Sequence, residues 1–128
     1  MVKILHVEDN AIQRELVQRL LELEFQGCEV QFAGNGREGF ERAQSWQPDI
    51  ILMDLRMPQM DGFETIQSLK NTPVTAHIPI IAVSAWANLK NEERALSLGA
   101  SRCLVKPFDP DELMAAIKAC LAESQHSS

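Results

Sequence analysis

Five polar residues of this chain each stand at the end of a short apolar run, and together they could handle a phosphoryl group. They are Glu8, Asp9, Asp54, Ser84 and Lys106. Three neighbouring carboxylates repel one another, and a divalent cation relieves this repulsion. Mg²⁺ prefers oxygen ligands and commonly joins one or two carboxylates to a phosphate. An ammonium and a hydroxyl group would complete such a site by stabilising the phosphoryl oxygens.

The elements that must position these residues alternate between apolar runs and amphipathic segments. The expected strands cover residues 3–7, 28–33, 50–53, 78–84 and 102–105, and the expected helices cover residues 11–24, 36–46, 62 onward, 89–98 and 110–123. Continuous apolar strands separated by helices predict a parallel sheet with helices on both faces. Ligands of such sheets bind beyond the carboxyl ends of the strands, where all five polar residues fall.

Local patterns add four expectations about packing and local geometry. In the first helix, apolar residues at three- and four-residue spacing predict a buried face made of Ile12, Leu16, Leu20 and Leu23. Asp109 is expected to cap the last helix, with Pro110 in its first turn. His6 lies within the first strand and is expected to be a hydrogen-bonded core residue. Gly62 is expected to supply a backbone angle that other residues resist.

Composition limits the possible classes of protein. The 128 residues fit one domain, expected at 1–123 with a disordered tail at 124–128. A formal charge of −6 argues against direct nucleic-acid binding. No apolar run is long enough to cross a membrane, and the first ten residues do not fit a signal peptide, so we expect a cytoplasmic protein with no membrane partner. Three widely spaced cysteines indicate neither a disulfide framework nor a zinc site.

Four short motifs follow one another along the chain: HVEDN at 6–10, ILMDLRMPQMDG at 51–62, IIAVSAWA at 80–87 and LVKPF at 104–108. Together, in this order and spacing, they resemble the receiver domain of two-component response regulators. The resemblance covers essentially the whole chain. It implies a flavodoxin-like (βα)5 fold of the α/β class, with a five-stranded parallel sheet in the order 2-1-3-4-5.

The resemblance also implies roles for the acidic residues. Asp54 would accept a phosphoryl group from a phosphohistidine. Glu8, Asp9, Asp54 and the backbone carbonyl of Arg56 would hold Mg²⁺ as the cofactor. The domain would catalyse only its own phosphorylation and dephosphorylation, so it is not expected to be an enzyme acting on other substrates.

By the same resemblance, Lys106 would pair with the phosphoryl oxygens, and Ser84 would move to bond them after transfer. The peptide bond between Lys106 and Pro107 would be cis, an isomer that only about 5 to 6% of X-Pro bonds adopt.

Three positions are expected to tune or alter switching. The family usually has Tyr or Phe three residues before the lysine, but this chain has Cys103. A thiol is too small to sweep between exposed and buried positions as a ring does, so we expect signalling to depend more on the loop after Ser84 and on Trp86. Arg56 and Trp86 hold positions that tune water access to the aspartyl phosphate, and their bulk predicts a long-lived phosphate.

Other functions compete with this interpretation. A phosphatase of the haloacid-dehalogenase class needs a second Asp two residues after Asp54, where Arg56 stands. A flavodoxin-type electron carrier would have its flavin phosphate repelled by Glu8 and Asp9. A receiver that no longer takes phosphate, and acts only as a protein-interaction module, stays open because of Cys103.

The expected partners are a histidine kinase or histidine phosphotransfer protein and a downstream protein target or relay carrier. Because the chain ends with its fifth expected helix, we expect a stand-alone response regulator of a phosphorelay. It would signal by phosphorylation-dependent protein binding, as a monomer or weak dimer.

Overall fold

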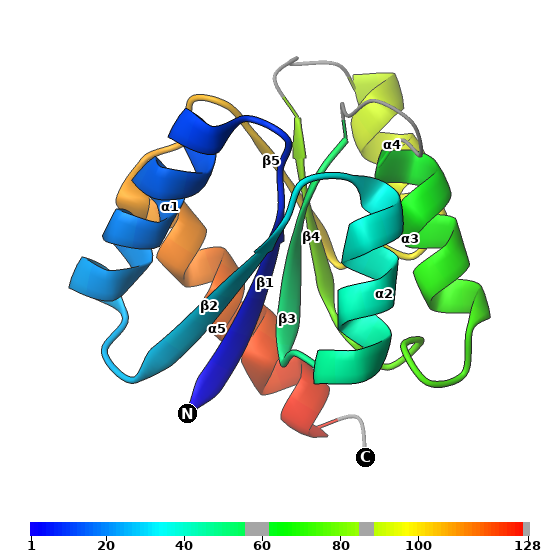
Figure 1. The fold of residues 1–128 in the computed structure, drawn as a ribbon. Helices are drawn as coiled ribbons and strands as arrows, with labels where there is room; N and C mark the ends of the chain where they lie inside the picture. Colours follow the sequence, from blue (N-terminus) through cyan, green and yellow to red (C-terminus); the bar gives the residue numbers. More distant parts are fainter. Residues whose placement is uncertain (56–61, 85–88, 127–128) are drawn as a thin grey trace.

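The computed structural model describes residues 1–55, 62–84 and 89–126, in which strands and helices alternate along the chain (Figure 1). The elements are β1 (Val2–Val7), α1 (Ala11–Glu24), β2 (Cys28–Ala33), α2 (Gly36–Trp46), β3 (Ile50–Asp54), α3 (Gly62–Asn71), β4 (Ile80–Ser84), α4 (Leu89–Ser97), β5 (Arg102–Val105) and α5 (Pro110–His126). The strands form one parallel sheet in the order β2-β1-β3-β4-β5. The expected flavodoxin-like fold is confirmed.

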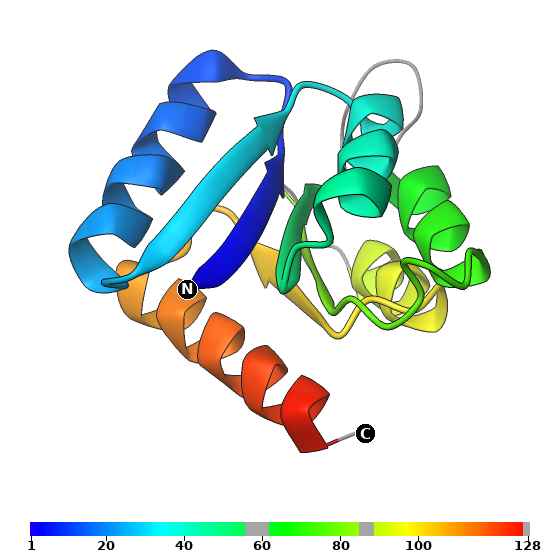
Figure 2. The same cartoon turned by 60° about the horizontal axis from the view of Figure 1, so that its bottom comes forward.

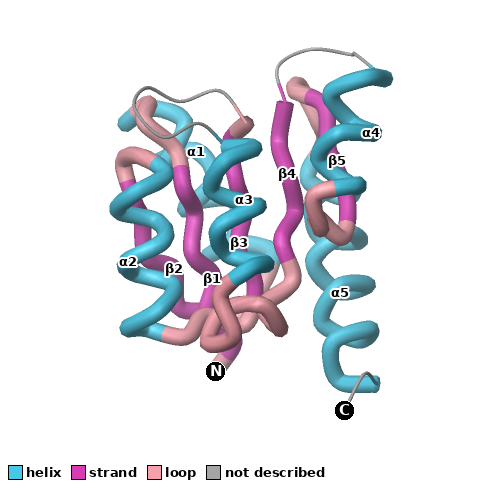
Figure 3. Tube along the Cα trace, turned by 90° about the vertical axis from the view of Figure 1, so that its right-hand side faces the viewer, coloured by secondary structure: helices cyan, strands magenta, loops and turns pink. Residues whose placement is uncertain are grey.

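Helices cover both faces of the sheet. Helices α1 and α5 lie on one face, and α2, α3 and α4 lie on the other (Figures 1 and 2). Figure 3 shows the second set, α2, α3 and α4, running along the same side of the strands. The inner strands β1, β3 and β4 therefore bury side chains in both directions, which is why β3 and β4 read as continuous apolar runs rather than alternating ones.

The apolar interior consists of two clusters, one on each face of the sheet. On the α1 and α5 face, the fully buried residues include Ile4, Leu21, Leu52, Leu113 and Ile117. On the other face they include Leu5, Val7, Met53, Ile66 and Leu69. Neighbouring residues of one strand belong to opposite clusters, as the two-residue period of a strand requires.

The predicted buried face of α1 was wrong. The structure exposes three of the four predicted residues: Ile12 by 68%, Leu16 by 56% and Leu23 by 79%. Leu21 is buried instead, with Val17 and Leu20 partly buried beside it. The helix carries two overlapping apolar stripes at helical spacing, and periodicity alone does not decide which of them faces the sheet.

The ends of two other elements differ from the prediction. Helix α5 continues to His126, beyond the expected end at Glu123, so part of the expected tail is helical. Its start agrees with the prediction, because the Glu112 backbone N–H donates to Asp109 Oδ1 at 3.0 Å. Strand β4 begins at Ile80 rather than Ile78, since the Ile78 N–H bonds back to the Thr75 carbonyl at 3.1 Å.

Gly62 is required by a close approach rather than by an unusual backbone angle. It starts α3 directly against the end of β3, where a Cβ atom would lie 2.4 Å from the Asp54 carbonyl oxygen. Its N–H donates to the Leu55 carbonyl at 3.4 Å. Any side chain here would push α3 away from the residues that follow β3.

Among residues 1–55, 62–84 and 89–126, no helix has the length and apolarity that crossing a membrane requires.

Candidate functional site

Three carboxylates from distant parts of the chain meet at the carboxyl edge of the sheet. Asp54 is the last residue of the central strand β3, and Glu8 and Asp9 follow β1 beside it. One oxygen from each of the three residues lies within 4.8 Å of the others. Asp54 and Glu8 are buried, whereas Asp9 is exposed. The strand-end rule therefore located this cluster from the sequence.

Lys106 supplies the positive charge of the cluster. Its Nζ lies 2.9 Å from Glu8 Oε1 and 4.0 Å from Asp54 Oδ2. Glu8 is only 2% exposed, so its carboxylate depends on this partner for stabilisation. Partial desolvation, together with a hydrogen bond to Glu8 and repulsion by it, raises the pKa of Asp9 above its usual value.

Ser84 and Lys106 come from neighbouring strands at the same edge. Ser84 is the buried last residue of β4, and its carbonyl accepts a 2.7 Å hydrogen bond from the Lys106 backbone N–H. The Lys106–Pro107 peptide bond is cis. Ser84 ends β4 and Lys106 directly follows β5, so both residues lie at the same edge of the sheet as the three carboxylates.

The cluster fits a divalent cation by its charge and by its donor type. The three carboxylates outnumber the ammonium of Lys106 that pairs with them, so the cluster is negative when all its groups are ionised. The donors are hard oxygens, which suit Mg²⁺ better than softer metals. Desolvation is the largest cause of the raised pKa of Asp9, and the repulsion by Glu8 that adds to it is the part that such a cation would relieve. Glu8, Asp9 and Asp54 are the described residues that would hold it.

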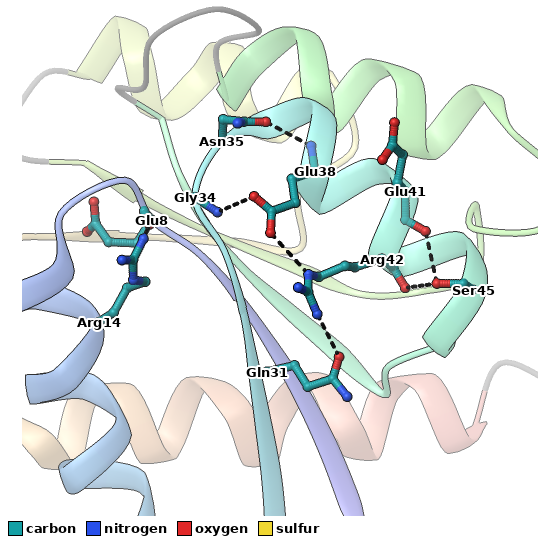
Figure 4. A network of polar contacts seen from close by, with 9 residues as sticks. All are labelled: Glu8, Arg14, Gln31, Gly34, Asn35, Glu38, Glu41, Arg42 and Ser45. Atoms are coloured by element: carbon teal, nitrogen blue, oxygen red, sulfur yellow. Dashed lines mark hydrogen bonds and ion pairs between the residues drawn. The ribbon is translucent and has the colours of Figure 1, made fainter.

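Arg14 of α1 also belongs to this site, although it was not among the residues predicted from the sequence. Its Nη1 donates to the backbone carbonyl of Glu8 at 2.9 Å (Figure 4). Asn10 caps α1 by accepting from the Gln13 N–H at 3.0 Å, and its own N–H reaches Glu8 Oε2 at 3.4 Å. The sequence could have indicated this contact of Arg14. Side chains in the first turn of a helix lean back toward its N-terminus, and this helix starts at the site.

The neighbouring loop between β2 and α2 is held by its own polar network (Figure 4). Asn35 caps α2 by accepting from the Glu38 N–H at 2.8 Å, and Glu38 accepts from the Gly34 N–H at 3.2 Å. Arg42 joins Glu38 to Gln31, with separations of 3.3 Å to each. This reciprocal capping fixes the loop that passes close to Arg14.

Two predicted site residues lie outside the described part of the chain: Arg56, with its backbone carbonyl, and Trp86. Cys103 is described. It is half-buried on β5 and packs against the core on the face of α2, α3 and α4. Burial, and secondarily the Glu92 carboxylate, raise the pKa of its thiol. Its predicted effect on switching stays a prediction.

A comparison with known protein families matches residues 4–118 to the response regulator receiver domain. The chain belongs to this family. The matched residues include all five polar residues at the carboxyl edge of the sheet, so the whole candidate site lies within the receiver domain.

Curated relatives of this receiver domain are response regulators. The chain is 36% identical to the DNA-binding dual master transcriptional regulator RpaA of Synechocystis, over 94% of the chain and 49% of that protein. It is 34% identical to the polar-differentiation response regulator DivK of Brucella anthropi, over 94% of the chain and 97% of that protein. The chain thus spans about half the length of several relatives; for a CpxR homologue of Haemophilus influenzae the share is 54% of that protein. It spans nearly the whole length of DivK.

Solved structures give the same fold. The Vibrio cholerae chemotaxis protein CheY4 is 31% identical with a TM-score of 0.85, over 94% of this receiver domain and 98% of that chain. A CheY-like receiver domain protein of Methanospirillum hungatei is 27% identical with a TM-score of 0.90, over 100% and 99%.

Proposed function

We propose that this receiver domain accepts a phosphoryl group on Asp54 from a phosphohistidine of a histidine kinase or histidine phosphotransfer protein. The observation that carries the proposal is the cluster of Asp54, Glu8 and Asp9 within 4.8 Å, with Lys106 Nζ 4.0 Å from Asp54. Such a cluster is costly to assemble without a ligand, and its charges match a cation and a phosphoryl group.

The proposed transfer is a direct displacement. An ionised Asp54 oxygen attacks phosphorus and needs no general base. The phosphorus–nitrogen bond of the donor breaks, and its electron pair stays on the ring nitrogen, so a protonated phosphoimidazole leaves as neutral imidazole. The product on this domain is an aspartyl phosphate.

The other residues of the site would stabilise the charge of the transferred group. Glu8, Asp9, Asp54 and the Arg56 carbonyl would hold Mg²⁺, which when bound would neutralise charge on the phosphoryl oxygens. Lys106 now lies closer to Glu8 than to Asp54. Phosphoryl oxygens on Asp54 would offer it new acceptors, and the Ser84 hydroxyl would donate to another of them.

The proposed output is a change in protein binding. Phosphorylation adds charge and strong acceptor oxygens at Asp54, which biases neighbouring loops between alternative arrangements. A downstream protein or relay carrier would bind the altered surface in the cytoplasm. The second candidate is a receiver that takes no phosphate and acts only as an interaction module, favoured by Cys103 at the position where the family has an aromatic ring.

Phosphorylation by a small donor tests this proposal. The protein is incubated with Mg²⁺ and acetyl phosphate or phosphoramidate and then weighed by mass spectrometry. Wild type should gain one phosphoryl group. Asp54→Asn should not, whereas Asp49→Asn should, because Asp49 is an exposed acid at the opposite end of the same strand. No gain by wild type, or a gain that survives Asp54→Asn, would support the interaction module instead.

A further inference from the structure

The backbone that carries Glu8 and Asp9 is held on both sides of Glu8. The Glu8 N–H donates to the Ala33 carbonyl of β2 at 2.9 Å, and the Glu8 carbonyl accepts from Arg14 Nη1 at 2.9 Å. The Glu8 carbonyl and the Asp9 N–H belong to one planar peptide unit. Arg14 therefore fixes the orientation of the backbone from which the Asp9 side chain extends.

The three carboxylates of the cluster differ in what holds them in place. Asp54 ends a buried central strand, and the buried Glu8 carboxylate pairs with Lys106 Nζ at 2.9 Å. Asp9 lies beyond the end of β1 and is exposed. Groups on strands are positioned more precisely than groups on loops. The position of the Asp9 carboxylate thus depends more than the other two on its local backbone.

The guanidinium group of Arg14 is itself confined. Arg14 is half-buried near the start of α1, and a Cβ atom placed on Gly34 would lie 3.5 Å from its Nη1. The Gly34 N–H donates to Glu38 Oε2 at 3.2 Å, which holds the loop between β2 and α2. Arg14 Nη1 thus lies close to both the Glu8 carbonyl and this loop. A confined side chain loses less conformational freedom when it forms a hydrogen bond.

We propose that Arg14 is a positioning residue of the cation site, whose bond to the Glu8 carbonyl keeps the Asp9 carboxylate near Glu8 and Asp54 before the metal binds. This role presupposes the Mg²⁺ site of the proposed function. Replacing a residue that orients a metal ligand typically weakens metal binding by about 10- to 100-fold. The charge of Arg14 acts in the opposite direction, because a positive group near the site repels Mg²⁺. The two effects therefore differ in sign.

Calorimetric titration with Mg²⁺ measures that sign. Arg14→Met removes the charge and the donor but keeps the apolar stem, and it should bind Mg²⁺ about tenfold more weakly than wild type. If charge repulsion dominated, the same variant would bind Mg²⁺ more tightly, and high salt would reduce the difference. The matched control is Arg19→Met, because Arg19 is an exposed arginine of the same helix that pairs with Glu15 at 2.8 Å. The control should bind Mg²⁺ as wild type does.

A second measurement uses the metal-free protein. In ¹⁵N relaxation, the order parameter of the Asp9 amide should fall from about 0.85 in wild type to about 0.6 in Arg14→Met. Arg19→Met should keep the value of wild type. If Arg14 only stabilised the fold, its replacement would lower the urea midpoint and leave the Mg²⁺ affinity and the Asp9 order parameter of the folded protein unchanged.

The possible failures are distinguishable. Equal or tighter Mg²⁺ binding by Arg14→Met, or an unchanged Asp9 order parameter, would overturn the role of Arg14 and leave the proposed function intact, because the phosphoryl gain on Asp54 is measured separately. Absence of Mg²⁺ binding by wild type would overturn the proposed cation site and the role of Arg14 together. If Arg14→Met does not fold, Arg14→Gln, also uncharged, is measured with the same expected and overturning results.

Discussion

Replacing Lys106 with methionine should destabilise the protein through Glu8 rather than through lost packing. Methionine keeps most of the side-chain length but removes the charge, which leaves the Glu8 carboxylate buried without the cation now 2.9 Å away. Removing one partner of a fully buried ion pair costs about 3 to 5 kcal/mol. Lys106 is 26% exposed, so water would replace part of its effect, and we expect the lower end, about 3 kcal/mol.

Urea unfolding followed by circular dichroism measures this loss. With a typical urea dependence of about 1 to 3 kcal/mol per molar, the midpoint should fall by roughly 1 to 3 M. Adding Glu8→Gln to Lys106→Met should recover much of the loss, because the unpaired carboxylate is gone. Lys118→Met, an exposed change on α5, should have little effect.

Two results would refute this reasoning. The first is a Lys106→Met protein as stable as wild type. The second is a loss that Glu8→Gln does not reduce, which would mean that Lys106 stabilises the fold by packing its stem and not by pairing with Glu8.

Three further predictions concern neighbouring positions. Because the pKa of Asp9 is raised in the fold, ionisation of Asp9 destabilises the metal-free protein as the pH rises. In urea unfolding without Mg²⁺, Asp9→Asn should therefore be more stable than wild type at pH 7. The difference in stability should disappear below the ordinary pKa of 3.8. Arg14→Ala should weaken Mg²⁺ binding in calorimetry by freeing the Glu8 carbonyl, and the matched change Arg19→Ala should not. Asp109→Ala should cost about 1 kcal/mol in urea unfolding by removing the cap of α5, and an unchanged midpoint would contradict that assignment.

The parallel sheet and the meeting of the carboxylates were predictable because each depends on patterns along the chain. Continuous apolar runs between amphipathic segments predict buried parallel strands, and the strand-end rule then brings Glu8 and Asp54 together. The order of the strands, in contrast, came from the resemblance to receiver domains. Local spacing does not encode which strands become neighbours.

The features that were missed depend on contacts across the fold. The two apolar stripes of α1 are equally regular in sequence, and only packing against the sheet selects Leu21 over Leu16. The bond from Arg14 to the Glu8 carbonyl depends on how the helix leaves the site. The Nδ1 of His6 has no hydrogen-bond partner among the described residues, and its sheet neighbours Phe32 and Leu52 have no polar side-chain atoms.

The sheet separates two apolar clusters that share no residue, one under α1 and α5 and one under α2, α3 and α4. Because substitutions without shared contacts have nearly additive effects, changes in the helices on one face should leave the packing of the helices on the other face intact. The two halves are thus free to diversify independently during evolution. The face of α1 and α5 can acquire new binding partners while the face that contains Cys103 changes how the domain responds. Substitutions on one face then need no compensating substitutions on the other.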